Sequence, residues 1–539
     1  MVLSTEQKMN ASRRLNRKIA GVMVPLFSIR TEKNFGIGEI LDLIPFLDWM
    51  AGHHLSLLQI LPLYECVPNE TSPYQALSSF AIDPIYLSLQ QWKDFKDNPE
   101  GGQYLKFRSV QDDLTRWRQS KSVCYEPIRK LKDRMLRIAF TRFKTQEWDQ
   151  RTTRAIAFEK FIREKSSWLD EYALFRILKE RYHGSCWTEW PIPFRKQDPD
   201  ALRQFAHDEE NSLLFIKYIQ WALFEQWSIV RKYARTLKIR IMGDLPFLVG
   251  RDSADVWGRQ QEFSLCHSVG APPDDFSADG QEWGLPMFHR ETMQRDDFAW
   301  WQLRAREAGT LYDMLRLDHV VGFFRTWVIP KEGAPYFDLE NEAQQVVCGE
   351  MMLKALIQAL GDCIPLAEDL GVIPDFVRQS LAQQQIPGHK ILRWEKWGHQ
   401  YNPPEDYPFL SMATTGTHDT STLCQWWNEI AIEERANFIK ILDHPDEISS
   451  DSDFSEVLHK KIIDCILRTT SCLVVLPIQD ILAIEDRINL PNTVGPHNWR
   501  FRIPLLLSEL DQQSPYRERL SSLKSLIERH RRTVPGNAS

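Results

Sequence analysis

The chain has 539 residues, of which 43% are hydrophobic, so it is long enough to bury a large core in one elaborated domain. Its formal net charge of −7 argues against nucleic acid and anionic membrane surfaces as partners, because both require a basic face. No apolar run approaches the length of a membrane span.

Cysteine usage and the first residues indicate the compartment. The nine cysteines are scattered, odd in number and without a CxxC pair, which is typical of reduced thiols rather than a disulfide framework. Residues 1–20 carry five basic side chains and no apolar segment, so we interpret them as a lead-in rather than a signal peptide. We therefore expect a cytoplasmic protein. The sequence does not indicate its oligomeric state.

The first part of the chain predicts two buried strands with a helix between them. Continuous apolar runs at Gly21–Phe27 and Leu57–Leu63 are typical of buried strands, and Ile40–Ala51 has the apolar spacing of a helix. The second strand opens into the loop Ser72–Phe80, where a proline fixes the turn and presents Tyr74 in a defined direction. A tyrosine that merely packs within this loop is the alternative.

A helix-rich insertion is predicted next, at about 85–237, because Leu105–Phe143 and Arg154–Lys232 are charged and periodic at about 3.6 residues. A third strand, Ile239–Phe247, follows it. The segment at about 250–290 is dense in glycine and proline, so we expect a loop pinned in turns; an ordinary surface loop is the alternative.

The fourth strand, Met314–Gly322, ends by presenting a cation, a carboxylate and an imidazole. Barrel strands deliver catalytic groups at their carboxyl ends in this way. We interpret Asp318 as a nucleophile, because Arg316 lies two residues earlier on the same strand face and can keep its charge and its rotamer fixed. A buried Arg–Asp ion pair without chemistry is the simpler interpretation of these two residues taken alone.

Two further strand ends carry carboxylates. Ile364–Gly371 presents Glu368, a candidate general acid, and Ala413–Thr420 presents His418 and Asp419. Carboxylates from three strands converge if the strands are parallel and curve round one axis. Retaining glycoside chemistry uses two carboxyl groups about 5 to 5.5 Å apart, and a third can stabilise the oxocarbenium-like state. The nineteen tryptophans mildly favour a sugar ligand, because sugars dock on flat aromatic faces.

The apolar run Phe409–Thr415 leads into the Ala413–Thr420 end, and two more runs, His389–Trp394 and Cys472–Ile478, complete the strand count. Eight strands that alternate with helices predict an α/β fold, a (β/α)8 TIM barrel with large helical insertions around the cleft. We expect the barrel to occupy residues 21–510 and a C-terminal helix and tail to occupy 511–539.

Six motifs occur in the chain in a fixed order: SPYQALSSFA, GDLPF, GAPPDDFSADGQEWGLP, RLDH, AEDLG and GTHD. With them the chain resembles the 4-α-glucanotransferases, the amylomaltase or disproportionating-enzyme family (glycoside hydrolase family 77), from about Gly21 to about Arg502. The resemblance implies transfer of α-1,4-glucan segments from malto-oligosaccharides or glucans to glucose or another glucan. It also implies a retaining double displacement through a covalent glycosyl-enzyme.

The resemblance also places site residues. Asp318 is then the nucleophile, Glu368 the acid and base, and Asp419 the group that stabilises the flattened ring. The expected substrate-binding residues are Ser72, Tyr74, Asp244, Asp274, Gln281, Trp283, Arg316, His319, His418 and Asn498. The segment at about 250–290 becomes a lid that excludes water from the cleft. No cofactor is implied, and no metal, since ligand spacings such as HExxH do not occur.

Two departures from the family pattern stand in the sequence. Phe27–Arg30 replaces the Ser-Leu-Pro tract of many members, and His497 replaces a proline before Asn498. Two alternatives to the transferase remain. One is an α-amylase-like retaining hydrolase, in which water replaces the sugar acceptor. The other is a non-catalytic glucan-binding protein that has kept the barrel.

Overall fold

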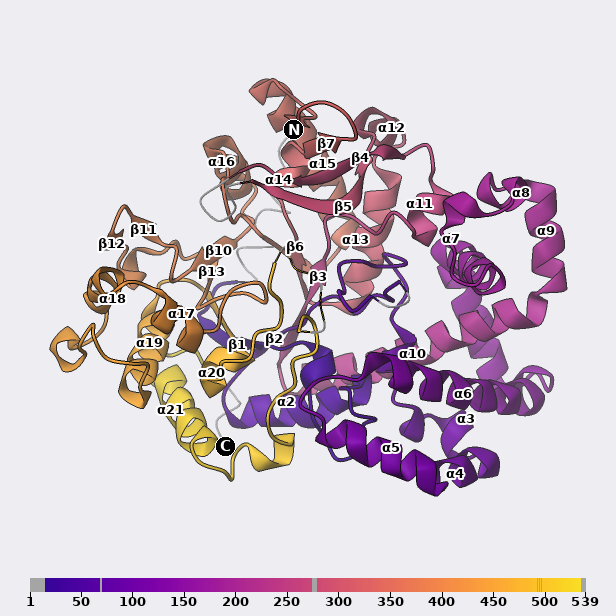
Figure 1. Cartoon of the computed structure of the whole chain (residues 1–539), viewed down its shortest axis with the longest axis horizontal. Helices are drawn as coiled ribbons and strands as arrows, with labels where there is room; N and C mark the ends of the chain where they lie inside the picture. The colour runs from indigo at the N-terminus through magenta and orange to yellow at the C-terminus, as the bar shows by residue number, and fades with distance from the viewer. Residues whose placement is uncertain are drawn as a thin grey trace.

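The computed structural model describes residues 15–67, 70–273, 279–491, 493, 495 and 497–534. At its centre lies an eight-stranded parallel sheet (Figure 1). In spatial order its strands are β10 (Gly388–Ile391), β13 (Ser411–Thr414), β14 (Leu473–Pro477), β1 (Ile19–Met23), β2 (Leu57–Gln59), β3 (Arg240–Leu245), β6 (Met314–Leu317) and β9 (Ile364–Ala367). The backbone N–H of Ala367 in β9 donates to the carbonyl of Pro387, next to β10, at 2.8 Å, so the sheet closes into a barrel.

All eight predicted strands are present, and the expected (β/α)8 barrel is confirmed. Their residues are almost all buried, as expected for parallel strands covered on both faces. Several strands are shorter than the apolar runs that predicted them, because turns begin inside those runs. In the first run Pro25 lacks an N–H for the sheet and the 3-10 turn η1 (Leu26–Ser28) follows it, so β1 ends at Met23.

The register between strands brings their polar ends together. β3 pairs with β6 so that Asp244 lies opposite Arg316. β6 pairs with β9 so that their last residues, Leu317 and Ala367, lie opposite each other. Asp318 and the glutamate after Ala367 are therefore the first residues beyond a shared edge, which is the carboxyl end of the barrel.

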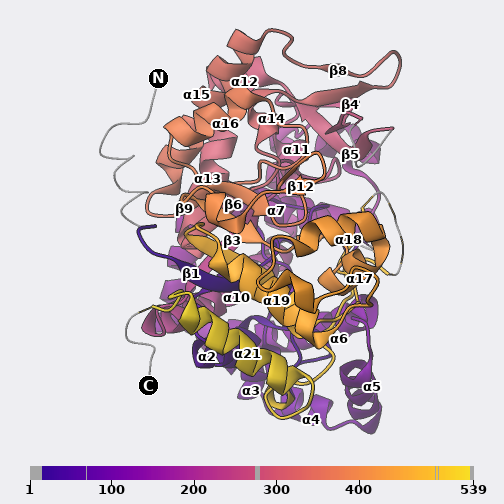
Figure 2. The ribbon, with the colours of Figure 1, turned by 90° about the vertical axis from the view of Figure 1, so that its left-hand side faces the viewer.

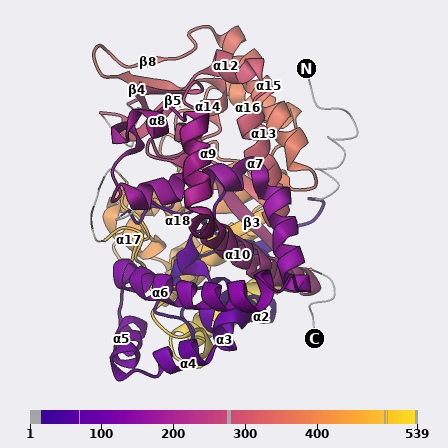
Figure 3. The same ribbon diagram turned by 90° about the vertical axis from the view of Figure 1, so that its right-hand side faces the viewer.

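Helices fill the chain between β2 and β3, and Figures 1 and 3 show them gathered on one side of the barrel. They are α3 (Lys93–Lys96), α4 (Pro99–Leu105), α5 (Arg108–Gln119), α6 (Tyr125–Phe143), α7 (Thr153–Arg181), α8 (Ile192–Arg195), α9 (Pro199–Asp208) and α10 (Glu210–Thr236). Asp94 of α3 is fully buried and accepts hydrogen bonds from Arg154 of α7 at 2.5 and 2.7 Å and from Tyr218 of α10 at 2.9 Å. Hydrogen bonds to the buried Asp94 side chain thus join helices α3, α7 and α10.

The segment at about 250–290, expected to be a loop, contains two strands of an antiparallel sheet outside the barrel. This sheet has the order β5 (Gln281–Phe288), β4 (Phe263–Ala271), β7 (Trp327–Pro330), β8 (Tyr336–Phe337). The sequence obscured it, because β4 carries register shifts and β5 contains Pro286. That proline is tolerated because β5 is an edge strand. The predicted site residue Asp274 lies outside the described residues.

The remaining helices surround the barrel (Figures 1 and 2). They are α2 (Leu43–Gly52), α11 (Ala254–Gly258), α12 (Arg290–Arg295), α13 (Ala299–Leu311), α14 (Val321–Phe324), α15 (Glu342–Leu360), α16 (Asp375–Gln383), α17 (Leu423–Glu429), α18 (Ile432–Ile439), α19 (Glu456–Arg468), α20 (Ile478–Leu482) and α21 (Tyr516–Arg529). A hairpin, β11 (Lys396–Trp397) and β12 (Gln400–Tyr401), lies beside α18. In the described part of the chain no helix has the length and apolar character needed to cross a membrane.

Close packing of the barrel against α13 makes a stability prediction. A Cβ added to Gly243 of β3 would stand 2.4 Å from two ring carbons of Tyr312, so one of the two residues must move. We expect Gly243→Ala to lower the free energy of unfolding by about 1 to 3 kcal/mol in a denaturant titration. Gly102→Ala, in helix α4 with no atom within 4 Å of its new Cβ, is the matched control and should be neutral or slightly stabilising. Equal stability of the two variants would contradict the packing argument.

Candidate active site

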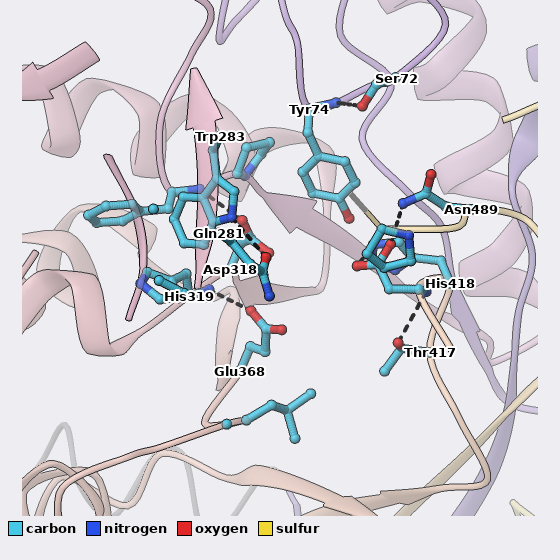
Figure 4. Close-up of a pocket in the computed structure, with 18 of the residues that line it drawn as sticks. Ser72, Tyr74, Gln281, Trp283, Asp318, His319, Glu368, Thr417, His418 and Asn489 are labelled. Carbon is cyan, nitrogen blue, oxygen red and sulfur yellow. Dashed lines mark hydrogen bonds and ion pairs between the residues drawn. The ribbon is translucent and has the colours of Figure 1, made fainter. Parts of the chain in front are cut away.

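A cleft of about 1610 Å³ opens at the carboxyl ends of the barrel strands (Figure 4). Residues after β2, β6, β9 and β13 line it, together with β5 and the segment around residues 487–500. The three predicted carboxylates Asp318, Glu368 and Asp419 all face this one cavity. In barrel enzymes the active site lies at this end.

Arg316 contacts three carboxylates at the centre of the site. Its guanidinium is 3% exposed and contacts carboxylates from three neighbouring strands. Nη1 lies 2.6 Å from Asp244 Oδ2 and 2.9 Å from Asp318 Oδ1, and Nη2 lies 3.1 Å from Glu368 Oε1. A buried guanidinium suits this task, because its planar fork can donate to several acceptors at once and it does not lose its charge.

Asp318 is fixed by backbone as well as by Arg316. Its own N–H donates to Leu245 O at 3.1 Å, and the N–H of Phe247 donates to Asp318 Oδ2 at 3.2 Å. Oδ1 is held by the guanidinium, and the side chain keeps 20% of its surface exposed to the cleft. The Arg316 guanidinium and the Phe247 N–H therefore fix the orientation of the carboxylate, which remains accessible from the cleft.

Glu368 is held in a similar way. Its N–H continues the sheet to Leu317 O at 3.0 Å, and Oε2 accepts a hydrogen bond from the backbone N–H of His319 at 2.6 Å. His319 itself adopts a left-handed backbone conformation, with φ of 46°. A non-glycine residue rarely adopts such a φ, which makes this a strained position at the site.

The Asp318 and Glu368 carboxyls titrate as a pair. Burial, the charge of Glu368 and the charge of Asp244 outweigh Arg316 and raise the pKa of Asp318 to about 8. Burial also opposes ionisation of Glu368, but Arg316 and the His319 N–H outweigh it and lower the pKa of Glu368 to about 2. The pair therefore holds one proton at neutral pH, and that proton can be exchanged between the two carboxyls without changing their total charge.

Asp419 has the opposite surroundings. His418 Nε2 lies 3.1 Å from its Oδ2, and Asn489 Nδ2 donates to its Oδ1 at 2.6 Å. Although burial favours the neutral acid, the charge and hydrogen bond of His418 and the bond from Asn489 lower the pKa of Asp419 to about 2. In return, Asp419 raises the pKa of His418 against the effect of burial. The third carboxylate is thus permanently ionised.

Tyr74 connects the two halves of the site. Its hydroxyl donates to Asp244 Oδ2 at 2.7 Å, and its ring stacks on His418 with centroids 5.3 Å apart at an angle of 14°. Ser72 Oγ accepts the Tyr74 N–H at 3.4 Å and so helps to hold the loop. Tyr74 is therefore fixed in the cleft rather than packed inside its own loop.

The antiparallel sheet forms one wall of the cleft. Trp283 of β5 stands edge-on to His319, with ring centroids 4.6 Å apart, and its indole N–H donates to Gln281 Oε1 at 3.0 Å. Gln75 Nε2 donates to the carbonyl of Trp283 at 3.3 Å, so the wall is tied to the Tyr74 loop. The structure thus brings Gln281 and Trp283 to the carboxylates, as Figure 4 shows.

Asn498 also lines the cleft, but its amide is occupied within its own segment. Oδ1 accepts from Leu490 N at 2.9 Å, and Nδ2 donates to Thr493 O at 2.9 Å and to Thr493 Oγ1 at 3.0 Å. The residue that reaches a carboxylate from this part of the chain is Asn489, which the sequence analysis did not select. No periodic or motif signal distinguishes Asn489 from the loop residues around it.

Within the part of the chain that the structure describes, no group of three or more His, Cys, Asp or Glu side chains has an arrangement that would hold a metal ion. The arrangement that is present can do acid–base and nucleophilic chemistry. It offers a carboxyl pair with one shared proton, a third carboxylate that stays ionised, and aromatic faces for a ring-shaped ligand.

Comparisons with known proteins show the family and the fold of the chain. The family model for glycoside hydrolase family 77, described as 4-alpha-glucanotransferase, matches residues 24–508. A 4-alpha-glucanotransferase of Chlamydia pneumoniae is 33% identical over 506 residues, which cover 91% of this chain and 92% of that protein. A chloroplastic/amyloplastic 4-alpha-glucanotransferase of Solanum tuberosum is 32% identical over 494 residues, covering 87% and 80%. In fold, the chain is similar to an amylomaltase from Streptococcus agalactiae solved with acarbose, with a TM-score of 0.82 at 24% identity, covering 96% of this chain and all of that one.

The shared proton predicts how stability depends on pH. The pKa of Asp318 rises from its ordinary value of 3.8 to about 8 in the folded chain. Folding therefore favours the protonated carboxyl, and this stabilisation is complete below pH 3.8 and is lost as the pH rises through about 8. Between about pH 5 and about pH 9 we expect the melting temperature of the wild type to fall more steeply than that of Asp318→Asn. Glu282→Gln, which changes an exposed carboxylate on the wall of the same cleft, should keep the wild-type slope. Parallel slopes for all three proteins would refute the shared proton.

Proposed function

Because the chain belongs to glycoside hydrolase family 77, the 4-alpha-glucanotransferases, we propose that it moves α-1,4-glucan segments by a retaining double displacement. The donor would be a malto-oligosaccharide or a longer glucan, and the acceptor the 4-hydroxyl of glucose or of another glucan. The observation that carries the proposal is the position of Asp318 and Glu368 on the two terminal nitrogens of one buried guanidinium, Arg316. This supports the short carboxyl separation that retaining chemistry requires.

In the first displacement, Asp318 attacks the anomeric carbon while Glu368 gives its proton to the glycosidic oxygen. The bond from Asp318 to the sugar forms, the glycosidic bond breaks, and the leaving segment departs as a neutral alcohol. A bound donor places a hydrogen-bond acceptor beside Glu368 and an electrophile beside Asp318. Binding therefore favours the form of the pair in which Glu368 holds the shared proton.

In the second displacement, Glu368 acts as a base toward the acceptor 4-hydroxyl. The acceptor oxygen attacks the anomeric carbon, the bond to Asp318 breaks, and the proton returns to Glu368. Two inversions give net retention. Asp419, kept ionised by His418 and Asn489, stabilises the positive charge of the flattened ring in both steps.

The binding residues then have distinct tasks. Tyr74 offers a ring face to the sugar at the bond to be cut, and Asp244 supports Tyr74 and Arg316 together from the floor of the site. Gln281 and Trp283 cover the cleft and limit the access of water to the glycosyl-enzyme. Asn498 acts by holding Leu490 and Thr493 at the edge of the cleft.

The reaction class is tested by incubation with maltotriose. Transfer predicts a ladder of longer oligomers together with glucose, whereas an α-amylase-like hydrolase yields only shorter products and a non-catalytic binding protein yields none. Asp318→Asn and Glu368→Gln should each lower the rate by at least about 10³-fold, because each removes a group that makes or breaks a bond. Glu433→Gln, which changes an exposed carboxylate on α18 outside the cleft, should retain the wild-type rate. A wild-type ladder from Asp318→Asn would overturn the assignment.

A donor with a fluoride leaving group separates the two roles. Fluoride departs without a proton, so α-maltosyl fluoride bypasses the general acid but still needs the nucleophile. With this donor we expect Glu368→Gln to release about one fluoride per enzyme rapidly and then to slow, because no base activates the acceptor. Asp318→Asn should show no burst in a fluoride-electrode trace. A burst in Asp318→Asn and none in Glu368→Gln would exchange the two roles.

A further inference from the structure

Arg304 is a buried cation that the proposed chemistry does not use. It lies on α13, is 1% exposed, and packs against the rings of both Trp300 and Trp301, with its guanidinium carbon 4.5 and 4.6 Å from their centroids. Trp300 is itself fixed, because its indole N–H donates to buried Asp255 at 2.8 Å. Among the described residues no carboxylate lies within 4.0 Å of the Arg304 nitrogens.

The hydrogen bonds of Arg304 point toward the proposed nucleophile. Nη2 donates to Pro246 O at 2.5 Å, and Nη1 donates to Phe247 O at 3.3 Å. Pro246 O and Phe247 N belong to one peptide group, and that N–H donates to Asp318 Oδ2 at 3.2 Å. Arg304 thus donates a hydrogen bond to the carbonyl oxygen of the Pro246–Phe247 peptide, and the N–H of the same peptide donates to Asp318. A donor on the carbonyl fixes the peptide plane and polarises its N–H, which strengthens the second hydrogen bond.

The charge of Arg304 also acts on the site. A buried cation without a carboxylate in contact is costly, and burial lowers the pKa of Arg304 to about 10. The groups that favour its charged form are Tyr64, Asp255 and Asp318. Asp318 in turn feels Arg316, Glu368 and Asp244 from the neighbouring strands. Arg304 is therefore a second buried cation whose charge interacts with Asp318, although it does not line the cleft.

We propose that Arg304 is a positioning residue for the transfer reaction: it holds the Pro246–Phe247 peptide so that the Phe247 N–H keeps Asp318 aimed into the cleft. The role rests on the proposed function of Asp318. It acts through the peptide and through the field at the carboxyl pair, without contact to the substrate. Loss of the cation should therefore alter the reaction rate and the titration of the pair while leaving substrate affinity in place.

The test compares two substitutions at one position. Arg304→Met removes the charge and the hydrogen bonds but keeps an apolar side chain packed against the two tryptophans. We expect its kcat with maltotriose to fall by roughly 10- to 100-fold, with KM changed by less than about 2-fold. We also expect the alkaline limb of its pH–rate profile to move up by about half a unit or more, since loss of a cation raises the pKa of a nearby carboxyl pair. Arg304→Lys keeps the charge but loses the fork, so its kcat should fall less and its alkaline limb should stay in place.

Arg532 provides a matched control. It is fully buried and donates to the backbone carbonyls of Leu467, Thr469 and Ser471, in the turn before β14 at the opposite end of the barrel. Burial lowers its pKa to about 10, as for Arg304. Arg532→Met should therefore cost a similar amount of stability and leave kcat per folded molecule and the pH profile unchanged.

The outcomes are separable. A folded Arg304→Met with the wild-type kcat, or one whose alkaline limb does not move, overturns the positioning role, as does an equal effect of Arg532→Met. If Arg304→Met does not fold, Arg304→Lys decides: a reduced kcat at unchanged KM supports the proposal, and wild-type kinetics reject it. Failure of the proposed function itself would appear earlier, as absence of transfer by the wild type.

Discussion

The structure depends on one buried cation, Arg316, that ties the ends of three strands together. Asp244, Asp318 and Glu368 come from β3 and from the residues just beyond β6 and β9, and each contacts the same guanidinium. Three carboxylates at this distance would repel one another without it. Burying such a cluster contributes little net stability, because desolvation offsets attraction. Its consequence is positional: the parallel register cannot shift by a residue without separating the charges.

The site then divides its carboxyls by their surroundings. Asp318 and Glu368 share Arg316 and repel each other, so together they keep one proton. Asp419 contacts His418 and the Asn489 amide and holds no proton at neutral pH. In the free site the shared proton therefore lies on Asp318, and the proposed retaining transfer requires it to move to Glu368 when a donor binds. The three carboxyls thus differ in their protonation through their neighbours alone.

Sequence reasoning predicted the barrel and the meeting of the carboxylates, because both follow from short-range patterns. Parallel strands end at one edge, so polar residues at the ends of Met314–Leu317 and Ile364–Ala367 must lie close together. The antiparallel wall was missed, since β4 and β5 carry irregular register and a proline, and the pairing of β4 with β7 joins segments far apart in sequence. Asn489 and Arg304 were missed for another reason. Each is defined by a contact across the fold, Asn489 with Asp419 and Arg304 with Pro246, and nothing in the local sequence marks such a contact.

The antiparallel wall of the cleft is linked to Glu368, the proposed acid, through His319. Trp283 stands against the ring of His319, and the backbone N–H of that same histidine holds Glu368. His319 thus contacts the wall with its ring and Glu368 with its backbone, in a left-handed conformation that non-glycine residues rarely adopt. On the other side, Gln75 ties the Trp283 carbonyl to the loop that carries Tyr74. The wall, the Glu368 hydrogen bond and the Tyr74 loop therefore meet at one tryptophan. In the proposed transfer, which requires water to be kept from the glycosyl-enzyme, a sheet held at these contacts would cover the cleft more firmly than a free loop.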